Sequence, residues 1–268
     1  MSRPLIAITG ANAGIGRATA TELGRRGFDL VLFGRSEART VPVLGELAAV
    51  GAGARFVACD LTSLASVAEA ARQVPDPIEV LINNAGVGGR RGVTADGFEL
   101  AFGVNHLGHH LLTRLLLPRI RRRVVTVSSN AHFGAPGIDW GRVRGKTRSL
   151  TGWREYQASK LANVLFSREL SRRAGGGVTT YCVHPGMVST GMWRLPPPFR
   201  RLVIRNLVPV DQGAETSVWC ATDPDLGGET GAYYVRRRPG RTSEVAADDA
   251  LALELWDRSE GWLAPYLA

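Results

Sequence analysis

Along the chain, short apolar runs rich in β-branched residues alternate with longer segments whose apolar residues recur at helical spacing. The strand-like runs are LIAIT (5–9), DLVLF (29–33), ARFVACD (54–60), EVLIN (79–83), RVVTVSS (123–129), VTTYCV (178–183) and GAYYV (231–235). Strands that alternate with amphipathic helices are typical of a parallel sheet covered on both faces. The pattern therefore predicts an α/β fold, a doubly wound parallel sheet of seven strands with helices on both faces.

Length and composition favour one domain. The 268 residues are 44% apolar, which is enough to bury a sizeable core. No linker, repeat or low-complexity tract divides the sequence. We therefore expect a single domain over residues 1–268.

The charge balance narrows the choice of partners. A net charge of +9 would suit an anionic ligand or nucleic acid, but the basic residues are dispersed. The two short clusters, RRR at 121–123 and RRRPGR at 236–241, are interpreted as solvated surface. We expect no nucleic-acid partner.

The cysteines and the apolar runs bear on location. Cys59, Cys182 and Cys220 lie in apolar contexts without the spacing of disulfide pairs or metal ligands, which is typical of a reducing cytosol. The run PLIAIT is too short for a signal peptide or a membrane span, and Arg114 interrupts LLTRLLL. A cytoplasmic protein without a membrane partner is the expectation.

The first strand is followed by the glycine-rich turn TGANAGIG. Its Gly10, Gly14 and Gly16 lie between the strand and the helical segment RATATELGRRG. A tight turn, a close approach of backbone to a pyrophosphate and a close helix-to-strand contact each require a residue without a side chain, and the helix N-terminus then faces the anion. The turn predicts dinucleotide binding on a Rossmann-type fold, although glycine turns also occur for steric reasons alone.

The end of the second strand indicates which dinucleotide is bound. An NAD site usually has Asp or Glu here to hold the ribose hydroxyls, whereas this chain has Gly34 followed by Arg35, a bidentate phosphate donor. Arg17 supplies a second cation. The pattern favours NADP(H) over NAD(H). Two alternatives stay open: both arginines are ordinary solvated side chains, or Glu37 turns inward to bond a ribose.

Later strand ends also carry small or polar residues. Asp60 ends the third strand, where it can bond the adenine amino group or cap the helix that begins near Ser63. The fourth strand ends in Asn83-Asn-Ala-Gly86, the fifth in Ser128-Ser129 and the sixth in His184-Pro-Gly-Met-Val-Ser-Thr190. Sheets of this kind bind ligands at the carboxyl ends of their strands. We therefore expect the chemistry at this edge.

The stretch EYQASK opens a helix and places Tyr156 and Lys160 four residues apart, on one side. The chain has 31 arginines and two lysines, a bias typical of a GC-rich bacterial genome. A lysine kept against that bias indicates a need for a compact ammonium group. An isolated pair of this kind is usually a surface contact, so its meaning depends on the rest of the chain.

Taken together, these motifs resemble the short-chain dehydrogenase/reductase family. TGANAGIG, NNAG, VSS, YxxxK and HPG occur in the family's order and cover roughly residues 5 to 235. FGVNHLGHHLLT, VVTVSSNAH, ASKLANVLFSREL and TTYCVHPG resemble the retinol dehydrogenase-like branch, which includes bacterial oxidoreductases. Each motif alone is a weak signal, but five at successive strand ends are a strong one.

The resemblance implies a catalytic tetrad of Tyr156, Lys160, Ser129 and Asn105, with the family's second-serine pattern selecting Ser129 over Ser128. It also implies a set of cofactor-binding residues. These are Gly10, Asn12, Ala13, Gly14, Ile15, Gly16, Arg17, Arg35, Asp60, Leu61, Asn83, Ala85, Gly86, Tyr156, Lys160, Pro185, Gly186, Val188 and Thr190.

In this interpretation Tyr156 is the acid or base. A free phenol has a pKa of about 10 and exchanges protons slowly at neutral pH. The Lys160 ammonium and an oxidised nicotinamide are expected to lower the pKa of Tyr156. Ser129 would hydrogen-bond the developing alkoxide. Asn105 lies between Gly103 and Gly108 in a helix, consistent with a local kink that holds a proton-relay water.

Two other readings of the polar residues are set aside. His106, His109 and His110 lack the HExxH signature and have no carboxylate among them, so we expect no metal site. A hydrolase triad of Ser129, His132 and Asp139 lacks a nucleophile elbow and leaves the glycine motifs unexplained.

Two long segments bear on the substrate. One, near 130–153, carries Phe133, Trp140 and Trp153 between the predicted serine and tyrosine. The other, near 190–210, is broken by prolines and carries Met192, Trp193 and Phe199. Long loops in a compact domain are usually functional or disordered, and the second can close over the nicotinamide as a lid.

These features predict an NADP(H)-dependent oxidoreductase for a ketone, aldehyde or secondary alcohol on an apolar body, retinoid- or steroid-like. The alternative is a dinucleotide-sensing regulatory or scaffold protein on the same fold. The intact tetrad discriminates between them, because a sensor needs the glycine turn but not Tyr156 or Lys160. Family members commonly pair through the helices that hold Asn105 and Tyr156, so a homodimer is left open.

Overall fold

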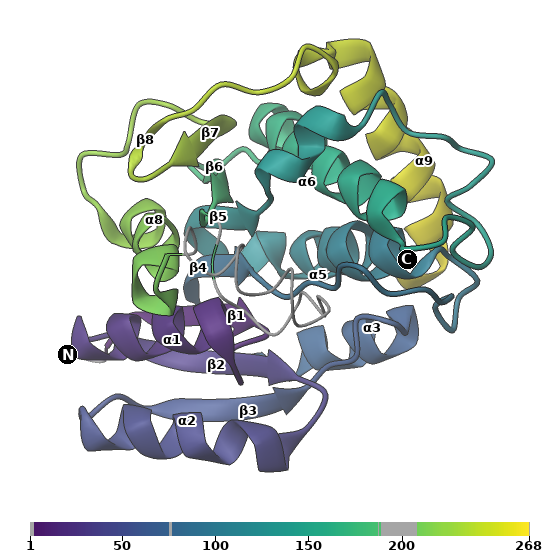
Figure 1. Ribbon diagram of the computed structural model, residues 1–268. Coiled ribbons are helices and arrows are strands. Elements are labelled where there is room, and N and C mark those ends of the chain that lie inside the picture. The colour runs from purple at the N-terminus through teal and green to yellow at the C-terminus, as the bar shows by residue number, and fades with distance from the viewer. Residues whose placement is uncertain (1–2, 75–76, 187, 189–207, 268) are drawn as a thin grey trace.

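Eight strands form one central sheet in the order β3-β2-β1-β4-β5-β6-β7-β8 (Figure 1). The structure is a computed structural model that describes residues 3–74, 77–186, 188 and 208–267. The strands are β1 Leu5–Thr9, β2 Asp29–Gly34, β3 Ala54–Ala58, β4 Ile78–Asn83, β5 Ile120–Val127, β6 Thr179–His184, β7 Ala232–Val235 and β8 Arg238–Pro239. The order reverses beside β1, which is where a doubly wound sheet opens its ligand crevice.

All seven predicted strands are present and parallel, but the sheet has an eighth strand that the sequence pattern did not predict. β8 pairs antiparallel with β7, with Val235 opposite Arg238. The two intervening residues, Arg236 and Arg237, have φ of 52° and 58°. Such a two-residue turn usually carries Asn-Gly or Asp-Gly, and two arginines give no turn signal.

The helices lie on both faces of the sheet, as predicted. Their bounds are α1 Gly14–Arg25, α2 Glu37–Ala49, α3 Leu64–Arg72, α4 Leu100–Phe102, α5 Gly108–Leu116, α6 Trp153–Arg173, α8 Val210–Thr222 and α9 Asp249–Leu267. Alternate strand residues divide between two cores, because side chains in a strand point to opposite faces. Ile6 and Ile8 of β1 join the core under α1, α2 and α8, whereas Ala7 joins the core under α3, α5, α6 and α9.

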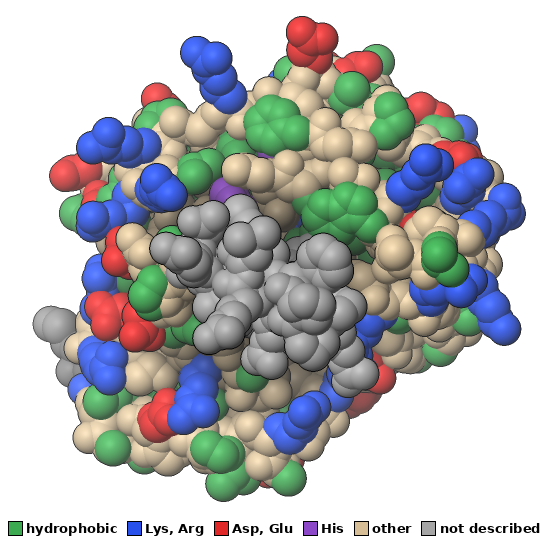
Figure 2. All heavy atoms as spheres, in the orientation of Figure 1, with side chains coloured by type: hydrophobic (Ala, Val, Ile, Leu, Met, Phe, Trp, Pro, Cys, Tyr) green, Lys and Arg blue, Asp and Glu red, His purple; other side chains and the backbone are tan. Residues whose placement is uncertain are grey.

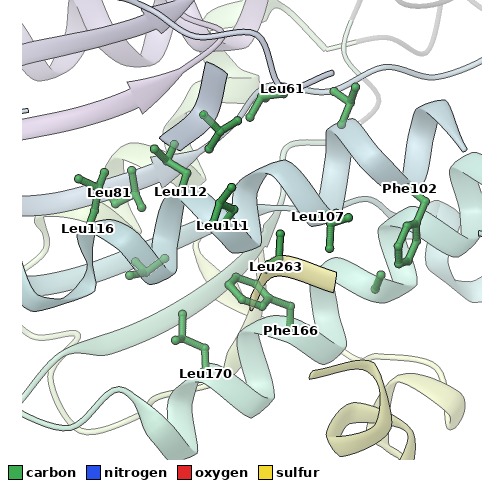
Figure 3. Close-up of a cluster of buried hydrophobic side chains, with 14 of the residues drawn as sticks. Leu61, Leu81, Phe102, Leu107, Leu111, Leu112, Leu116, Phe166, Leu170 and Leu263 are labelled. Carbon is green, nitrogen blue, oxygen red and sulfur yellow. The ribbon is translucent and has the colours of Figure 1, made fainter. Parts of the chain in front are cut away.

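The second of these cores fixes the helix that carries Asn105. Leu107, Leu111 and Leu116 are fully buried, and they lie among side chains of β4, α6 and α9 in Figure 3. Burying a leucine contributes roughly 1.5–3 kcal/mol, so this stripe holds the helix against the sheet and against α6. The site residues on both helices are thereby placed at the same edge.

One basic cluster differs from its predicted role. Arg121 and Arg122 are exposed, but Arg123 is 3% exposed and donates to the backbone oxygens of Cys220 (3.1 Å), Asp223 (2.6 Å) and Leu226 (2.7 Å). The arginine therefore satisfies carbonyls at the end of α8 that the helix itself cannot pair. Sequence spacing alone did not indicate that α8 would end beside β5.

The rest of the basic surface agrees with the dispersed pattern. The side chains of Arg236–Arg238 are exposed. On the face in Figure 2, Lys and Arg side chains lie at several separate places with Asp and Glu between them. The described residues on that face therefore form no continuous basic field.

The C-terminal helix α9 packs on α5 and α6. These are the helices through which family members commonly pair. Trp256 of α9 stacks on Phe166 of α6, with ring centroids 5.9 Å apart. Glu260 of α9 accepts hydrogen bonds from Arg114 of α5. No helix in the described ranges combines the length and apolarity needed to cross a bilayer.

Candidate active site

A cavity of about 830 Å³ opens at the carboxyl edge of the sheet and is lined by the ends of strands β1 to β6 and the starts of α1 and α6. Most of the residues predicted for the site line this cavity. They are Gly10, Asn12, Ala13, Gly14, Ile15, Gly16, Arg35, Asp60, Leu61, Ala85, Gly86, Ser129, Tyr156, Lys160, Pro185, Gly186 and Val188. Three predicted residues, Arg17, Asn83 and Asn105, do not line it, and Thr190 lies outside the described residues.

The glycine turn after β1 has the geometry that a bound phosphate requires. Gly10 has a φ of +70°, and a Cβ there would lie 2.9 Å from Ala85. A Cβ on Gly16 would lie 2.2 Å from the Gly10 carbonyl oxygen. No side chain among the described residues caps the N-terminus of α1, so its first N–H groups are left for an anion in the cavity.

Arg35 and Arg17 occupy different surroundings near the end of β2. Arg35 lines the cavity and has no ion-pair partner among the described residues. The guanidinium of Arg17 instead pairs with Glu46 of α2, with 3.2 Å between Nε and Oε2. Thr21 donates to the same carboxylate. Of these two arginines, Arg35 is therefore the one that the structure presents to the cavity, whereas Arg17 is held outside it.

Asp60 both lines the cavity and organises its own loop. Its Oδ1 accepts from the backbone nitrogen and the hydroxyl of Thr62, at 3.0 and 2.8 Å. The cap of helix α3 is Ser63, whose hydroxyl accepts from the Ser66 nitrogen. The alternative in which Asp60 merely caps that helix does not hold.

Tyr156, Ser129 and Lys160 meet at the wall formed by α6 and the end of β5. Lys160 is 3% exposed, its Nζ donates to the Val127 carbonyl at 3.0 Å, and burial lowers its pKa to about 8. Burial raises the pKa of Tyr156, and a hydrogen bond with Ser129 opposes that rise. In the protein alone, burial therefore sets the direction of the Tyr156 pKa shift, and the lowering expected from Lys160 together with an oxidised nicotinamide stays a prediction.

Asn105 lies in a π-helical turn, Gly103–Leu107, which confirms a local irregularity in this helix. π-turns occur frequently at functional sites. The Asn105 amide is buried and faces the chain segment after β4: its Oδ1 accepts from the Val87 nitrogen at 2.7 Å and its Nδ2 donates to the Val87 oxygen at 2.9 Å. Nδ2 also donates to Ser159 Oγ. The amide thus holds the cavity wall rather than facing the cavity.

Asn84 lines the cavity in place of Asn83, which was the predicted residue. Asn83 is fully buried and donates to Thr113 in the core. Asn84 lines the cavity and its amide donates to the Thr9 carbonyl at 2.8 Å. Asn83 is the last residue of β4, so strand alternation turns it toward the helices. The second asparagine of the pair was the stronger candidate.

His184, quoted in the sequence motif but given no role, lines the cavity. It is 6% exposed, and its Nδ1 has no hydrogen-bond partner among the described residues. Burial lowers its pKa to about 4, so the ring is neutral at pH 7. The sequence could have indicated this place, because His184 ends a predicted strand and ligands bind at the strand ends of such sheets.

The alternative histidine chemistries find no support. His132 Nδ1 contacts the Ser129 backbone oxygen at 2.7 Å, and its Nε2 accepts from the Ser243 nitrogen, so neither nitrogen activates the Ser129 hydroxyl. In the described part of the chain, no three His, Cys, Asp or Glu side chains are grouped to hold a metal ion.

The segment near 130–153 contributes to both the cavity wall and the core. Asn130, Ala131, Gly134 and Trp153 line the cavity, and Ala135, Ile138 and Val143 are buried in the core. Trp153 stacks on Tyr156, with centroids 5.4 Å apart, and lines the cavity. Trp140 packs on Trp262 of α9, and Phe133 is half exposed. Met192, Trp193 and Phe199 of the segment near 190–210 lie outside the described residues.

Comparison with known proteins identifies the family. The family model for short chain dehydrogenase matches residues 4–197. This chain belongs to the short-chain dehydrogenase family. It is 39% identical to mouse retinol dehydrogenase 14 (95% of this chain, 84% of the relative) and 37% identical to human retinol dehydrogenase 13 (95% and 82%). It is therefore an oxidoreductase acting on CH–OH groups, in the retinol dehydrogenase-like branch.

Solved structures agree. An uncharacterized protein from Mycobacterium paratuberculosis superposes with a TM-score of 0.84 at 34% identity, covering 98% of this chain and 94% of that one. A blue fluorescent protein from a metagenomic library, solved with NADPH, has a TM-score of 0.71 at 25% identity and covers 87% and 95%. The fold and the cavity at the strand ends are thus those of a nicotinamide dinucleotide-binding enzyme.

Proposed function

We propose that this enzyme uses NADP(H) to interconvert a carbonyl and an alcohol on an apolar substrate. One observation carries the proposal: Tyr156, Ser129 and Lys160 line the same cavity as the N-terminus of α1 and Arg35, which have no side-chain cap and no ion-pair partner among the described residues. A phenol, a hydroxyl and an ammonium group are thereby placed in one compartment with a phosphate-binding turn. No other cluster among the described residues combines these features.

The preference for NADP(H) rests on the ribose end of the cavity. Gly34 and Arg35 both line it, and Glu37, the residue that could have bonded a ribose instead, does not. Arg35 has a planar fork that matches two oxygens of a phosphate. An unpaired guanidinium at that place favours the dinucleotide with the extra phosphate. Solved relatives with NADPH support the same choice.

The protein's own groups supply the proton chemistry. A bound nicotinamide dinucleotide gives or takes the hydride. In the reducing direction Tyr156 donates its phenolic proton to the carbonyl oxygen, and Ser129 donates a hydrogen bond to the same oxygen as charge develops on it. With a pKa of about 8, Lys160 is still mostly protonated at neutral pH. Its positive charge stabilises the phenolate that remains on Tyr156.

The apolar substrate class rests on the surroundings of Tyr156. The ring of Trp153 stacks on it, and Val87 and Val188 add apolar side chains to the same cavity. Relatives named for retinol, an alcohol on a long apolar body, point to the same class, a retinoid- or steroid-like molecule. The three buried free cysteines support a reducing compartment such as the cytoplasm.

The test is turnover of NADPH, followed by its absorbance, with a panel of aldehydes and ketones of increasing apolar size. We expect NADPH oxidation with at least one large apolar carbonyl and little with a small hydrophilic one. Tight NADPH binding without any turnover would instead support the dinucleotide-sensing alternative. Turnover with NADH at an equal efficiency would overturn the cofactor assignment.

A further inference from the structure

The Thr9 hydroxyl, at the end of β1, is saturated by its neighbours. Its oxygen accepts hydrogen bonds from the backbone nitrogens of Asn84 (3.0 Å) and Ala85 (2.9 Å). It also lies 2.9 Å from Nε2 of His109. A hydroxyl has two acceptor lone pairs and one proton. Since both lone pairs are used, the proton must point to the imidazole.

This arrangement sets the state of His109. Nε2 accepts the Thr9 proton, so the ring hydrogen is on Nδ1, which lies 3.0 Å from the Asn105 carbonyl oxygen and donates to it. The ring is 1% exposed, and burial lowers its pKa to about 4, in agreement with one neutral tautomer. The imidazole therefore bridges the end of β1 and the π-helical turn.

The two residues that His109 links, Thr9 and Asn105, bind the two ends of a segment in the cavity wall. The segment Asn84–Val87 lines the cavity. Thr9 binds the backbone at its start, and the Asn105 amide binds the backbone of Val87 at its end. His109 contacts the Thr9 hydroxyl and the backbone carbonyl of Asn105, the residue whose amide binds Val87. No other described side chain joins them by hydrogen bonds.

We propose that His109 is a positioning residue that fixes the wall Asn84–Val87 relative to the helix of Asn105, and thereby the place of the reacting groups. The inference rests on the proposed function. His109 touches neither cavity nor reacting atoms, so its effect passes through Thr9 and Asn105. A misplacement of about 1 Å in an active site can cost about 100-fold in rate. Loss of the bridge is expected to act in that way.

His106 offers a matched control in the same helical segment. Its ring is equally buried, and its Nε2 lies 3.1 Å from the hydroxyl of Ser259 in α9, not from a group at the cavity. His106→Phe and His109→Phe each remove one imidazole: the first removes the partner of the Ser259 hydroxyl, and the second leaves the Thr9 hydroxyl proton without an acceptor. A structural role predicts similar effects for both, whereas a positioning role predicts different ones.

The experiment compares His109→Phe, His106→Phe and His109→Gln for Tm, kcat, KM and the Kd of NADPH. Both phenylalanine variants should lose similar thermal stability. After correction for the folded fraction, His109→Phe should lose about 10- to 100-fold in kcat, and His106→Phe should stay within about threefold of the parent. His109→Gln should recover much of the loss, because its amide oxygen accepts from Thr9 and its amide nitrogen donates to the Asn105 carbonyl.

Equal losses in the two phenylalanine variants, parent-like kinetics in His109→Phe, or a glutamine variant as impaired as phenylalanine would each overturn the proposal. Thr9→Val, which removes the hydroxyl with little change in volume, should lose at least as much kcat as His109→Phe, because it also removes the acceptor of the Asn84 and Ala85 nitrogens. If the parent turns over no carbonyl, the proposed function fails. In that case NADPH binding still tests the positioning role. NADPH should bind more weakly to His109→Phe than to the parent and equally well to His106→Phe.

Discussion

The ammonium nitrogen of Lys160 lies 5.7 Å from the centroid of the Tyr156 ring, and it donates a hydrogen bond to the Val127 carbonyl. One turn of α6 thus places a buried cation beside a buried phenol. Burial acts oppositely on the two groups: it lowers the pKa of Lys160 to about 8 and raises that of Tyr156. In each case burial disfavours the charged form.

Replacing Tyr156 with phenylalanine should remove the proton donor while leaving dinucleotide binding nearly intact. General acid catalysis contributes about 100- to 10,000-fold, so kcat should fall by that order. Steady-state kinetics and NADPH titration by fluorescence measure the two effects separately. Turnover equal to that of the parent would contradict the proposed mechanism.

Lys160→Arg keeps a positive charge but replaces a compact ammonium with a planar fork at a residue that is 3% exposed. A charge-assisted hydrogen bond contributes about 1.5–3 kcal/mol, so we expect turnover to fall about tenfold or more, with weaker NADPH binding. Lys146→Arg, at the other lysine and outside the cavity lining, is the control. Parent-like activity in Lys160→Arg would contradict the inference that this lysine is kept because the site needs a compact ammonium group.

The depressed pKa of Lys160 has a consequence for stability. Its folded pKa of about 8 lies below the ordinary lysine value of about 10.4, so the unfolded chain binds this proton more tightly. Lys160 therefore costs stability at neutral pH, and that cost fades as the pH rises from about 8 to about 10.4. Urea unfolding of the parent and of Lys160→Met should show a gap in favour of methionine that narrows across this range. A gap that stays constant with pH would contradict the shift.

Arg35→Ala should weaken NADPH binding about tenfold or more, because one charge-assisted contact to a phosphate is lost, and should leave NADH binding unchanged. Parallel titration of parent and variant with both dinucleotides measures this. Equal affinity of the parent for NADH and NADPH, or an alanine variant with parent-like NADPH affinity, would show Arg35 to be merely solvated.

Glu46→Gln should release Arg17 toward the ribose end of the cavity. The pair is partly exposed, and such pairs contribute about 0.2–1 kcal/mol, so NADPH affinity should rise by at most about fivefold. NADH affinity should not change. Adding Arg17→Ala should cancel the gain if Arg17 is its source. A gain that persists in the double variant would assign the effect to the loss of Glu46 charge alone.

Local patterns in the sequence were sufficient to predict the fold class, and most of the residues that the family resemblance implied for the site do line the cavity. A glycine that must have positive φ, as Gly10 does, or that admits no Cβ, as Gly16 does, is visible as a glycine in the turn. Strand periodicity and the places where strands end are equally local properties. Parallel strands then bring those ends to one edge without further information.

Tertiary contacts decided the direction of individual side chains. Arg17 pairs with Glu46, 29 residues away, and Arg123 meets carbonyls about 100 residues away. Thr9 and His109 are likewise 100 residues apart. Such partners become neighbours only when the sheet and helices pack, so spacing along the chain could not reveal them. The pKa of Tyr156 was decided in the same way, because burial is a property of the packed structure and not of the residue.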